Sequence, residues 1–251
     1  MAAGSIRFGF KNFLRGVRDY VRPVRPKSQG EESAVLDRIL ESVAVPKLFV
    51  EFGFTPEEFN CAGLIGSFEG LLIDGDEQIV RRAQRILPRR LSVKRAFLDL
   101  ENLGLIRDFC ADRALGILSV DVDGNDYWLL ERSLDLRPVC IVVEYNASFG
   151  LRPISVPYDK SFARHAKHES GWYHGASLTA LSRLCGRGGY GLFDVTASGC
   201  NAFFVRSDTM DAAKFVAPES AYRENRLRNQ WSSTVAADQW QRIRHLEYVE
   251  V

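Results

Sequence analysis

From residue 46 onward, short apolar runs alternate with segments of helical periodicity. The apolar runs are continuous, which is typical of strands that are buried on both faces. They predict strands at 47–52, 70–73, 91–96, 115–122, 139–145, 191–195 and 202–206. The segments between them predict helices at 34–43, 56–66, 77–87, 103–112, 127–133 and 178–185.

This order of elements predicts an α/β fold with a mostly parallel seven-strand sheet, because strand–helix repetition favours right-handed parallel crossovers. The last two strands are separated by Ser198-Gly199, which indicates a turn. We expect a main domain over 34–210, with a loop-rich insertion at 147–176 that could serve as a substrate lid, and a C-terminal extension over 211–251.

The first 33 residues differ from the rest and predict a basic amphipathic arm followed by a linker. Residues 1–27 hold seven basic side chains against Asp19 alone, a net charge of +6, and the apolar positions at 10, 13, 14, 17 and 21 have helical spacing. Such a helix could contact an anionic membrane surface through residues 5–22, or it could pack on the body or on a second subunit.

Composition narrows the class of protein. The chain has 251 residues, is 46% hydrophobic and carries a net charge of +1, so we expect a globular protein and no nucleic-acid partner. Its five cysteines are scattered and never form a CxxC pair, which favours a reducing, cytoplasmic location over a secreted or zinc-binding protein.

Candidate chemistry lies where the predicted strands end, because ligands of open α/β sheets bind beyond the carboxyl ends of the strands. The first strand leads into Gly53, which permits a tight turn, and then into Thr55-Pro56, an expected helix start with Glu58 as its capping partner. Glu57 and Glu58 would then occupy the first helical turn and repel a pyrophosphate. The sequence therefore disfavours a dinucleotide and is compatible with a cationic ligand.

The ends of the next two strands offer contacts for a nucleoside. Asp74 follows the second strand, where Rossmann-like folds hold ribose hydroxyls with a carboxylate. Asp76 is expected to cap the next helix. Asp99 follows the third strand and is a candidate for binding an adenine amino group.

Acidic residues converge at the ends of the fourth and fifth strands. The acids there are Asp121, Asp123, Asp126 and Glu144, and the carboxamides are Asn125 and Asn146. Such groups are costly to bury unless they are paired, protonated or bound to a cation. Mg²⁺ or Ca²⁺ would suit these oxygen ligands, whereas helix capping and solvated loop acids are the simpler alternative.

Taken in order, these segments resemble class I S-adenosylmethionine-dependent methyltransferases, and most closely the FkbM-type family. The similar segments are VEFGF, GLLIDGD, LSVDVDGNDYWLLE, IVVEYNASFG, GASLTALSRLCGRGGYGLFDV and GCNAFFVR. The resemblance implies a Rossmann-like methyltransferase fold, with a seven-strand sheet whose last two strands form a C-terminal antiparallel hairpin, and S-adenosylmethionine (SAM) as cofactor. It implies cofactor contacts from Glu51, Gly53, Asn60, Asp74 and Asp121, and an Mg²⁺ ion on Asp121, Glu144 and Asn146.

The reaction implied is O-methylation of a small-molecule or glycan acceptor, at a hydroxyl of a sugar, a glycan or a secondary metabolite, with or without a metal. Asp121 would orient the acceptor, and His174 lies among aromatic residues and glycines, as a base over a sugar ring would. His165 and His168 lie beside lysine and arginine residues and indicate a solvated basic face.

One departure from the family pattern keeps a second class of function open. The usual glycine-rich cofactor loop is reduced to Gly53. A non-catalytic relative that keeps the fold and binds a partner, alone or as a homo-oligomer, would tolerate this change. A nucleotide or phosphosugar binder is a third option, which Glu57 and Glu58 disfavour.

Overall fold

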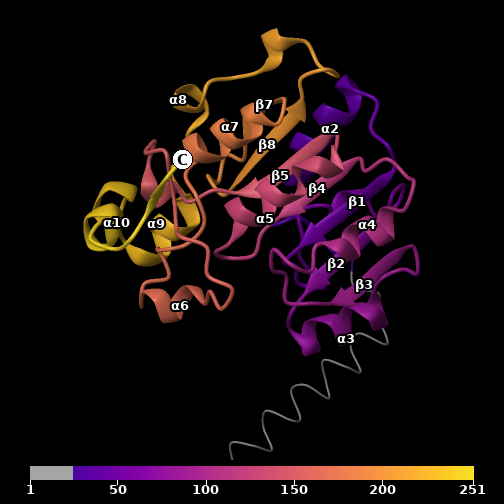
Figure 1. Cartoon of the computed structure of the whole chain (residues 1–251), viewed down its shortest axis with the longest axis horizontal. Coiled ribbons are helices and arrows are strands. Elements are labelled where there is room, and N and C mark those ends of the chain that lie inside the picture. The colour runs from indigo at the N-terminus through magenta and orange to yellow at the C-terminus, as the bar shows by residue number, and fades with distance from the viewer. Residues whose placement is uncertain (1–24) are drawn as a thin grey trace, which may run out of the picture.

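A seven-stranded sheet runs through the centre of the molecule (Figure 1). The structure is a computed structural model and describes residues 25–251. The strands are β1 (Leu48–Phe52), β2 (Glu69–Asp74), β3 (Leu91–Arg95), β4 (Ile117–Val120), β5 (Cys140–Glu144), β7 (Tyr190–Val195) and β8 (Asn201–Arg206). All seven predicted strands are confirmed, with ends that differ by up to two residues.

The strand order is β3-β2-β1-β4-β5-β8-β7, and β8 runs antiparallel to both of its neighbours. This is the Rossmann-like methyltransferase arrangement, so the predicted fold class is confirmed. The chain builds outward from β1 to β3 and then returns to place β4 on the other side of β1. The order of strands therefore reverses between β1 and β4, which is where such sheets bind ligands.

Helices cover both faces of the sheet. The helices of this domain are α2 (Glu32–Ser42), α3 (Glu77–Ile86), α4 (Gly104–Cys110), α5 (Asp126–Ser133) and α7 (Leu178–Arg187). One buried cluster joins Val50 to α4, α5 and α7, and the other joins Phe49 to α2 and α3. Because adjacent strand residues point to opposite faces, a continuous apolar strand feeds both clusters.

The predicted helix at 56–66 is wrong. Only the 3-10 turn η1 (Ala62–Leu64) forms there, and Thr55 and Glu58 instead exchange two backbone hydrogen bonds of 3.0 and 3.1 Å. Lys27 pairs with the same loop, since its N–H donates to the Glu57 carbonyl and its carbonyl accepts from Phe59. A strand-like pairing from a distant segment thus replaces the expected capping box.

The segment predicted as a linker packs against the domain. The Glu32 side chain is fully buried, and its carboxylate accepts hydrogen bonds from the Gly30 N–H and from Asn201 Nδ2. The amphipathic helix and the membrane contact predicted for residues 5–22 lie outside the described residues. Within residues 25–251, no helix has both the length and the apolar character needed to cross a membrane.

The insertion and the C-terminal extension pack on each other. The insertion contains η3 (Ala147–Phe149), β6 (Ile154–Ser155) and α6 (Arg164–Lys167). The extension contains η4 (Ala212–Lys214), α8 (Pro218–Ala221), α9 (Arg226–Ser232), α10 (Ala236–Ile243) and β9 (Val249–Glu250). A further 3-10 turn, η2 (Leu134–Leu136), lies between α5 and β5. β6 pairs with β9, and a separate aromatic cluster centred on Phe149 and Trp172 includes Ile243 of α10. Figure 1 shows α6, α9 and α10 gathered on one side of the sheet.

The packing of β2 on β1 yields a test of the core. A Cβ on Gly70 would overlap the Phe49 ring, whereas a Cβ on Gly66 would meet nothing within 4 Å. We expect Gly70→Ala to lower the free energy of unfolding by about 1–3 kcal/mol, because overpacking forces a buried ring to move. Gly66→Ala is the matched control and should change it by less than about 0.5 kcal/mol. Urea denaturation measures both, and equal stabilities would contradict this packing.

Candidate functional site

A cavity of about 600 Å³ lies at the carboxyl ends of β1, β2, β4 and β5. Its walls come from the loops that follow these strands and β3, with one residue from the N-terminal segment and two from the insertion. The lining residues are Gln29, Glu51, 53–55, 58–60, 73–76, Ile79, 96–98, 121–123, Asn125, Leu129, Glu144, Phe162 and Arg164. The structure therefore brings Glu51, Gly53, Asn60, Asp74, Asp121 and Glu144 together, as the sequence predicts.

The cavity is strongly acidic. In the described part of the chain its walls hold seven carboxylates, on Glu51, Glu58, Asp74, Asp76, Asp121, Asp123 and Glu144. Arg164 is the one basic residue among the lining residues. A cavity with this excess of negative groups favours a cationic ligand and repels an anionic one, and the effect is larger in a site with low-dielectric walls.

Gly53 lets β1 and β4 approach closely at the floor of the cavity. Its φ is +70°, in the left-handed region, and a Cβ there would overlap the backbone oxygen of Asp121. Its N–H donates to the Ile73 carbonyl at 3.0 Å, which ties the turn to the end of β2. Glycine is therefore required here by the backbone itself.

The buried side chain of Glu51 holds the backbone of the loop after β1. Its two carboxylate oxygens accept hydrogen bonds from the N–H groups of Asn60 at 2.6 Å and Cys61 at 2.9 Å. Burial raises the pKa of Glu51 to about 7, and these two bonds oppose that shift. Asn60 in turn donates to Ser119 Oγ and accepts from Asn201 Nδ2. Both residues touch the cavity, but these polar atoms hold the loop in place.

The β2 and β3 ends form the side of the cavity predicted to hold a nucleoside. Asp74 lines this side, and its Oδ1 accepts from the Asp76 N–H at 2.6 Å. Burial raises the pKa of Asp74. Asp76 caps α3 as predicted. Phe97 also lines the cavity and is 62% exposed, which leaves a bare aromatic face beside Asp74.

Asp99 lies outside the cavity wall that the preceding residues 96–98 help to form. It does not line the cavity, and its carboxylate forms an ion pair with Lys160 of the insertion at 2.9 Å. The hydrogen bond from Lys160 lowers the pKa of Asp99. Leu98, one residue earlier, takes the place in the wall where the sequence predicted a polar contact to adenine.

Two of the acidic residues after β4, Asp121 and Asp126, have different roles. Asp126 is fully buried, and its carboxylate accepts from the N–H groups of Val122 at 2.8 Å and Gly124 at 2.9 Å, so it closes the loop on itself. Burial raises its pKa to about 6. Asp121 instead faces the cavity, and burial together with the charges of Glu144 and Asp123 raises its pKa well above the usual range.

The insertion closes over the cavity through three contacts. Arg164 forms an ion pair with Asp123, which has a left-handed φ of +57°. Asn125 and Asp159 exchange two hydrogen bonds, of 2.8 and 3.2 Å. The Lys160 pair with Asp99 is the third contact. These contacts hold the insertion against the loops after β3 and β4, and its role as a lid stays a prediction.

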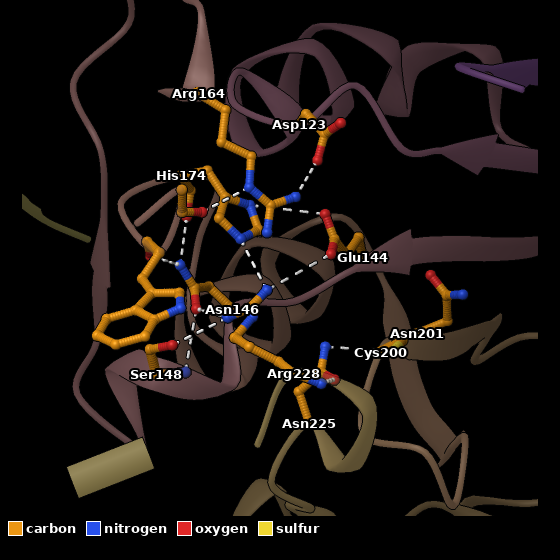
Figure 2. Close-up of polar contacts among 12 residues, drawn as sticks. Asp123, Glu144, Asn146, Ser148, Arg164, His174, Cys200, Asn201, Asn225 and Arg228 are labelled. Atoms are coloured by element: carbon orange, nitrogen blue, oxygen red, sulfur yellow. Dashed lines mark hydrogen bonds and ion pairs between the residues drawn. The ribbon is translucent and has the colours of Figure 1, made fainter. Parts of the chain in front are cut away.

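Beside Glu144, a buried arginine joins the site from the C-terminal extension (Figure 2). Arg228 of α9 is 7% exposed, and its Nη2 lies 2.9 Å from His174 Nε2. His174 Nδ1 lies 3.6 Å from Glu144 Oε2, and Arg228 Nη2 lies 3.9 Å from Glu144 Oε1. Burial and the charges of Arg164 and Arg228 lower the pKa of His174 well below its usual value. Sequence reasoning missed Arg228 and Arg164, because nothing in the local pattern marks either arginine as buried.

Asn146 is fully engaged within the protein. Its Oδ1 accepts from the Ser148 N–H at 3.0 Å and from Arg228 Nη1 at 2.7 Å. Its Nδ2 donates to the carbonyls of Trp172 and His174. A carbonyl oxygen has two lone pairs, and both are used here, so Asn146 has none left for a metal ion.

The predicted Mg²⁺ site does not fit these residues. Among the histidines, cysteines, aspartates and glutamates of residues 25–251, the ligand atoms that lie within 4.8 Å of one another belong to Asp123, Glu144 and His174. Arg228 has only donor groups, so His174 Nε2 must be the acceptor and the neutral ring must carry its proton on Nδ1. A protonated nitrogen cannot bind a metal, and a guanidinium beside Glu144 already supplies positive charge.

Comparison with known proteins adds likeness of fold. No family model and no curated protein matches the sequence. Among solved structures, this chain is similar to the N-terminal domain of EvdMO1 with SAH bound, at 15% identity and a TM-score of 0.47, covering 70% of this chain and 80% of that chain.

Two further solved structures show the same level of similarity. An S-adenosylmethionine-dependent methyltransferase from Mesorhizobium loti has 15% identity and a TM-score of 0.48, with 71% of this chain and 99% of that chain covered. Magnesium protoporphyrin IX methyltransferase from Synechocystis PCC 6803, with bound SAM, has 12% identity and a TM-score of 0.43, with 80% and 82% covered. At such identities the chemistry has to be argued from the site itself.

The buried carboxyls give a pH dependence of stability that can be measured. The folded pKa of Glu51, about 7, lies above its usual value of 4.5, so the folded state binds the proton more tightly. This contribution is complete below about pH 4.5 and is lost as the pH rises through about 7, with a size of roughly 3 kcal/mol. We expect the free energy of unfolding in urea to fall over that range.

Two substitutions isolate the contribution of Glu51. Glu51→Gln should make the decrease of stability with pH less steep, because the variant lacks the titrating group, and should also lower stability by about 1–3 kcal/mol, because an amide N–H₂ would face a backbone N–H. Glu41→Gln changes an exposed glutamate of α2 and should leave both quantities unchanged. A pH dependence that is the same in all three proteins would contradict this account.

Proposed function

We propose that this protein is a SAM-dependent methyltransferase that transfers the methyl group to a hydroxyl of a small acceptor. The observation that carries the proposal is the acidic cavity at the point where the strand order reverses in a sheet of the methyltransferase type. Fold alone does not imply function, so the charge of the cavity is the decisive element.

The charge of the cavity discriminates between classes of ligand. SAM carries a sulfonium and an ammonium group, which the acidic wall of the cavity attracts. A bound cation in turn favours the ionised form of the carboxyls whose pKa is raised by burial, among them Glu51, Asp121 and Glu144. A nucleotide or phosphosugar carries phosphates, which the same carboxylates repel, and that option is not proposed. Glu57 and Glu58, from which the sequence predicted this repulsion, do not lie on a helix.

The lining residues suggest how the cofactor is divided along the cavity. We assign the ribose hydroxyls to Asp74, and the adenine ring to the Phe97 face and Leu98 rather than to Asp99. Gly53 and Asp121 flank the β1–β4 end, where the cationic part of the cofactor would lie. Glu51 and Asn60 act indirectly, because their hydrogen bonds hold the loop that carries Gly53.

Methyl transfer from SAM requires few chemical groups from the protein. Bound SAM supplies a methyl group whose carbon–sulfur bond breaks with its electron pair remaining on sulfur. The chain must align the acceptor with the methyl group, exclude water and take up the acceptor's proton. The lid contacts of Arg164 and Asn125 exclude water, and Asp121 and Glu144 lie where the acceptor would approach.

The finer assignments are part of the proposal. The order of the motifs favours an FkbM-type enzyme acting on a sugar, glycan or secondary-metabolite hydroxyl. Metal assistance is not included, because Asn146, one of the predicted ligands, and His174, which lies close to Glu144, are both engaged by hydrogen bonds within the protein. A cytoplasmic location, membrane contact through residues 5–22 and assembly into a homo-oligomer stay predictions.

A non-catalytic binding protein is the second candidate. The observation in its favour is the reduced glycine loop, in which Gly53 stands alone. Catalysis and simple binding differ in one measurable respect, since only a methyltransferase releases S-adenosylhomocysteine (SAH) when SAM and an acceptor are both supplied. A partner protein would instead bind with or without SAM.

Cofactor binding is the direct test. We expect SAM and SAH to raise the melting temperature and to bind in calorimetry, whereas ATP does neither, because the cavity is acidic. Asp74→Asn should weaken SAM binding by about ten- to hundredfold, since a hydrogen bond to a charged group contributes about 1.5–3 kcal/mol. Asp108→Asn, on the exposed surface of α4, is the matched control and should bind as the parent does.

Two results would overturn the cofactor assignment. The first is the absence of any thermal shift or binding heat at millimolar SAM and SAH in a folded protein. The second is equal affinity of Asp74→Asn and Asp108→Asn for SAM, which would place the ligand elsewhere.

A further inference from the structure

Three residues from separate parts of the chain form a continuous series of contacts at the acceptor end of the cavity (Figure 2). Arg228 belongs to α9 in the C-terminal extension, His174 to the insertion, and Glu144 to the end of β5. Arg228 Nη2 contacts His174 Nε2 at 2.9 Å, and His174 Nδ1 faces Glu144 Oε2 at 3.6 Å. None of these contacts follows from the arrangement of strands alone.

Arg228 determines which nitrogen of His174 carries the proton. A guanidinium has five N–H donors and no acceptor, so His174 Nε2 must offer its lone pair. His174 is 1% exposed and lies near the positive charges of Arg164 and Arg228, which keep the ring neutral. The single proton of a neutral ring therefore sits on Nδ1.

The protonated nitrogen points at Glu144. His174 Nδ1 and Glu144 Oε2 are both buried, and neither has a hydrogen-bond partner in the structure. A buried donor and a buried acceptor at 3.6 Å need only a small movement to form a hydrogen bond, and leaving both unpaired is costly. With Oε2 committed in this way, Oε1 is the oxygen that Glu144 presents to the cavity, 3.9 Å from Arg228 Nη2.

We propose that Arg228 and His174 are positioning residues that hold Glu144 as the acceptor of a substrate hydroxyl's proton. This inference rests on the proposed function and deepens it by naming the residue that accepts the acceptor's proton and the two residues that position it. The hydroxyl oxygen forms the bond to the methyl carbon, the carbon–sulfur electron pair stays on sulfur, and the hydroxyl proton passes to Glu144 Oε1. Neither His174 nor a metal ion takes part in the proton transfer.

The hydrogen bonds exclude His174 as the base that the sequence predicted. Nε2 is occupied by Arg228, and Nδ1 already holds a proton, so the neutral ring has no free lone pair facing the cavity. Glu144 has the properties of a base instead, since its pKa is raised to about 8, near neutral pH. Burial of the Glu144 carboxyl is the main cause of the raised pKa. The acids that face Glu144 from the β4 loop are Asp121, Asp123 and Asp126. Arg164 of the insertion and Arg228 of α9 oppose the shift.

The tautomer of His174 is the first readout, and it needs no acceptor. In protein labelled with ¹⁵N-histidine, NMR should show His174 neutral, with a protonated Nδ1 and an unprotonated Nε2, in the presence and absence of SAH. Arg228→Met removes the donor, so the ring should become free to populate the Nε2–H tautomer as well, whereas Arg228→Lys should retain the parent tautomer alone. The signals of His165 and His168 are the internal control and should not change.

An Nε2–H or doubly protonated His174 in the parent protein overturns the proposal. So does a change of its tautomer on addition of Mg²⁺ or Mn²⁺, since that would mean metal binding at this nitrogen. Because the parent protein alone decides this point, the result stands even where Arg228→Met does not fold.

A pair of isosteric variants tests the contact between His174 and Glu144. His174→Asn keeps an N–H at the position of Nδ1, and His174→Gln places its amide near Nε2 and leaves Glu144 without the donor. With SAM and a panel of neutral polyols, primary amines and carboxylates, we expect SAH release only with polyols. The rate of SAH release with polyols should be retained in His174→Asn and should fall by about a hundredfold or more in His174→Gln and Glu144→Gln.

These arms separate the two proposals. SAM affinity should be the same in the parent and in both His174 variants, because His174 is not among the residues that line the cavity. Failure of the parent to bind SAM overturns the proposed function. Normal SAM binding with SAH release confined to amines or carboxylates, or with no release from any polyol, overturns the inference about Glu144 and leaves the cofactor assignment in place.

Discussion

The burial of carboxylates at the carboxyl ends of four parallel strands is the constraint on which the rest of the site depends. Each acid would be costly in a partly dry cavity unless something compensates it. The structure supplies a different compensation in each case: backbone N–H groups for Glu51 and Asp126, arginines for Asp123 and Glu144, and a raised pKa for Asp121. A cationic ligand in the cavity would stabilise the ionised form of these acids, and this is the basis of the proposed cofactor.

The C-terminal extension and the insertion belong to the site as much as the sheet does. The sheet provides Gly53, Asp74 and the two loops that carry acids, which suffices to describe a cofactor pocket. The acceptor side is built from the insertion, through Arg164 and His174, and from α9, through Arg228. Because the insertion and the extension share the aromatic cluster around Phe149, a change in one is expected to be felt by the other. On the proposed function, specificity for the acceptor would belong to these added segments.

Local sequence predicted well where local physics decides, and failed where a distant partner does. The strands were predictable because their continuous apolar runs require burial on both faces, and Asp76 was predictable as a cap because capping involves only the next three residues. The helix expected at 56–66 failed because Lys27 pairs with that loop and Glu51 accepts its N–H groups. Asp99 was expected in the cavity, but Lys160 from the lid holds its carboxylate in an ion pair.

By itself the sequence determined the fold class, the position of the glycine turn and the gathering of Asp74, Asp121 and Glu144 at one edge, since parallel strands necessarily bring their carboxyl ends together. Only the tertiary structure decided what each polar group does. The metal-ligand role predicted for Asn146 and the base role predicted for His174 both conflict with hydrogen bonds from Arg228, a residue 82 and 54 positions away in the chain. The direction of a hydrogen bond, and with it the place of a proton, is set by whichever donor packing brings into contact, and a linear pattern of residues does not contain that information.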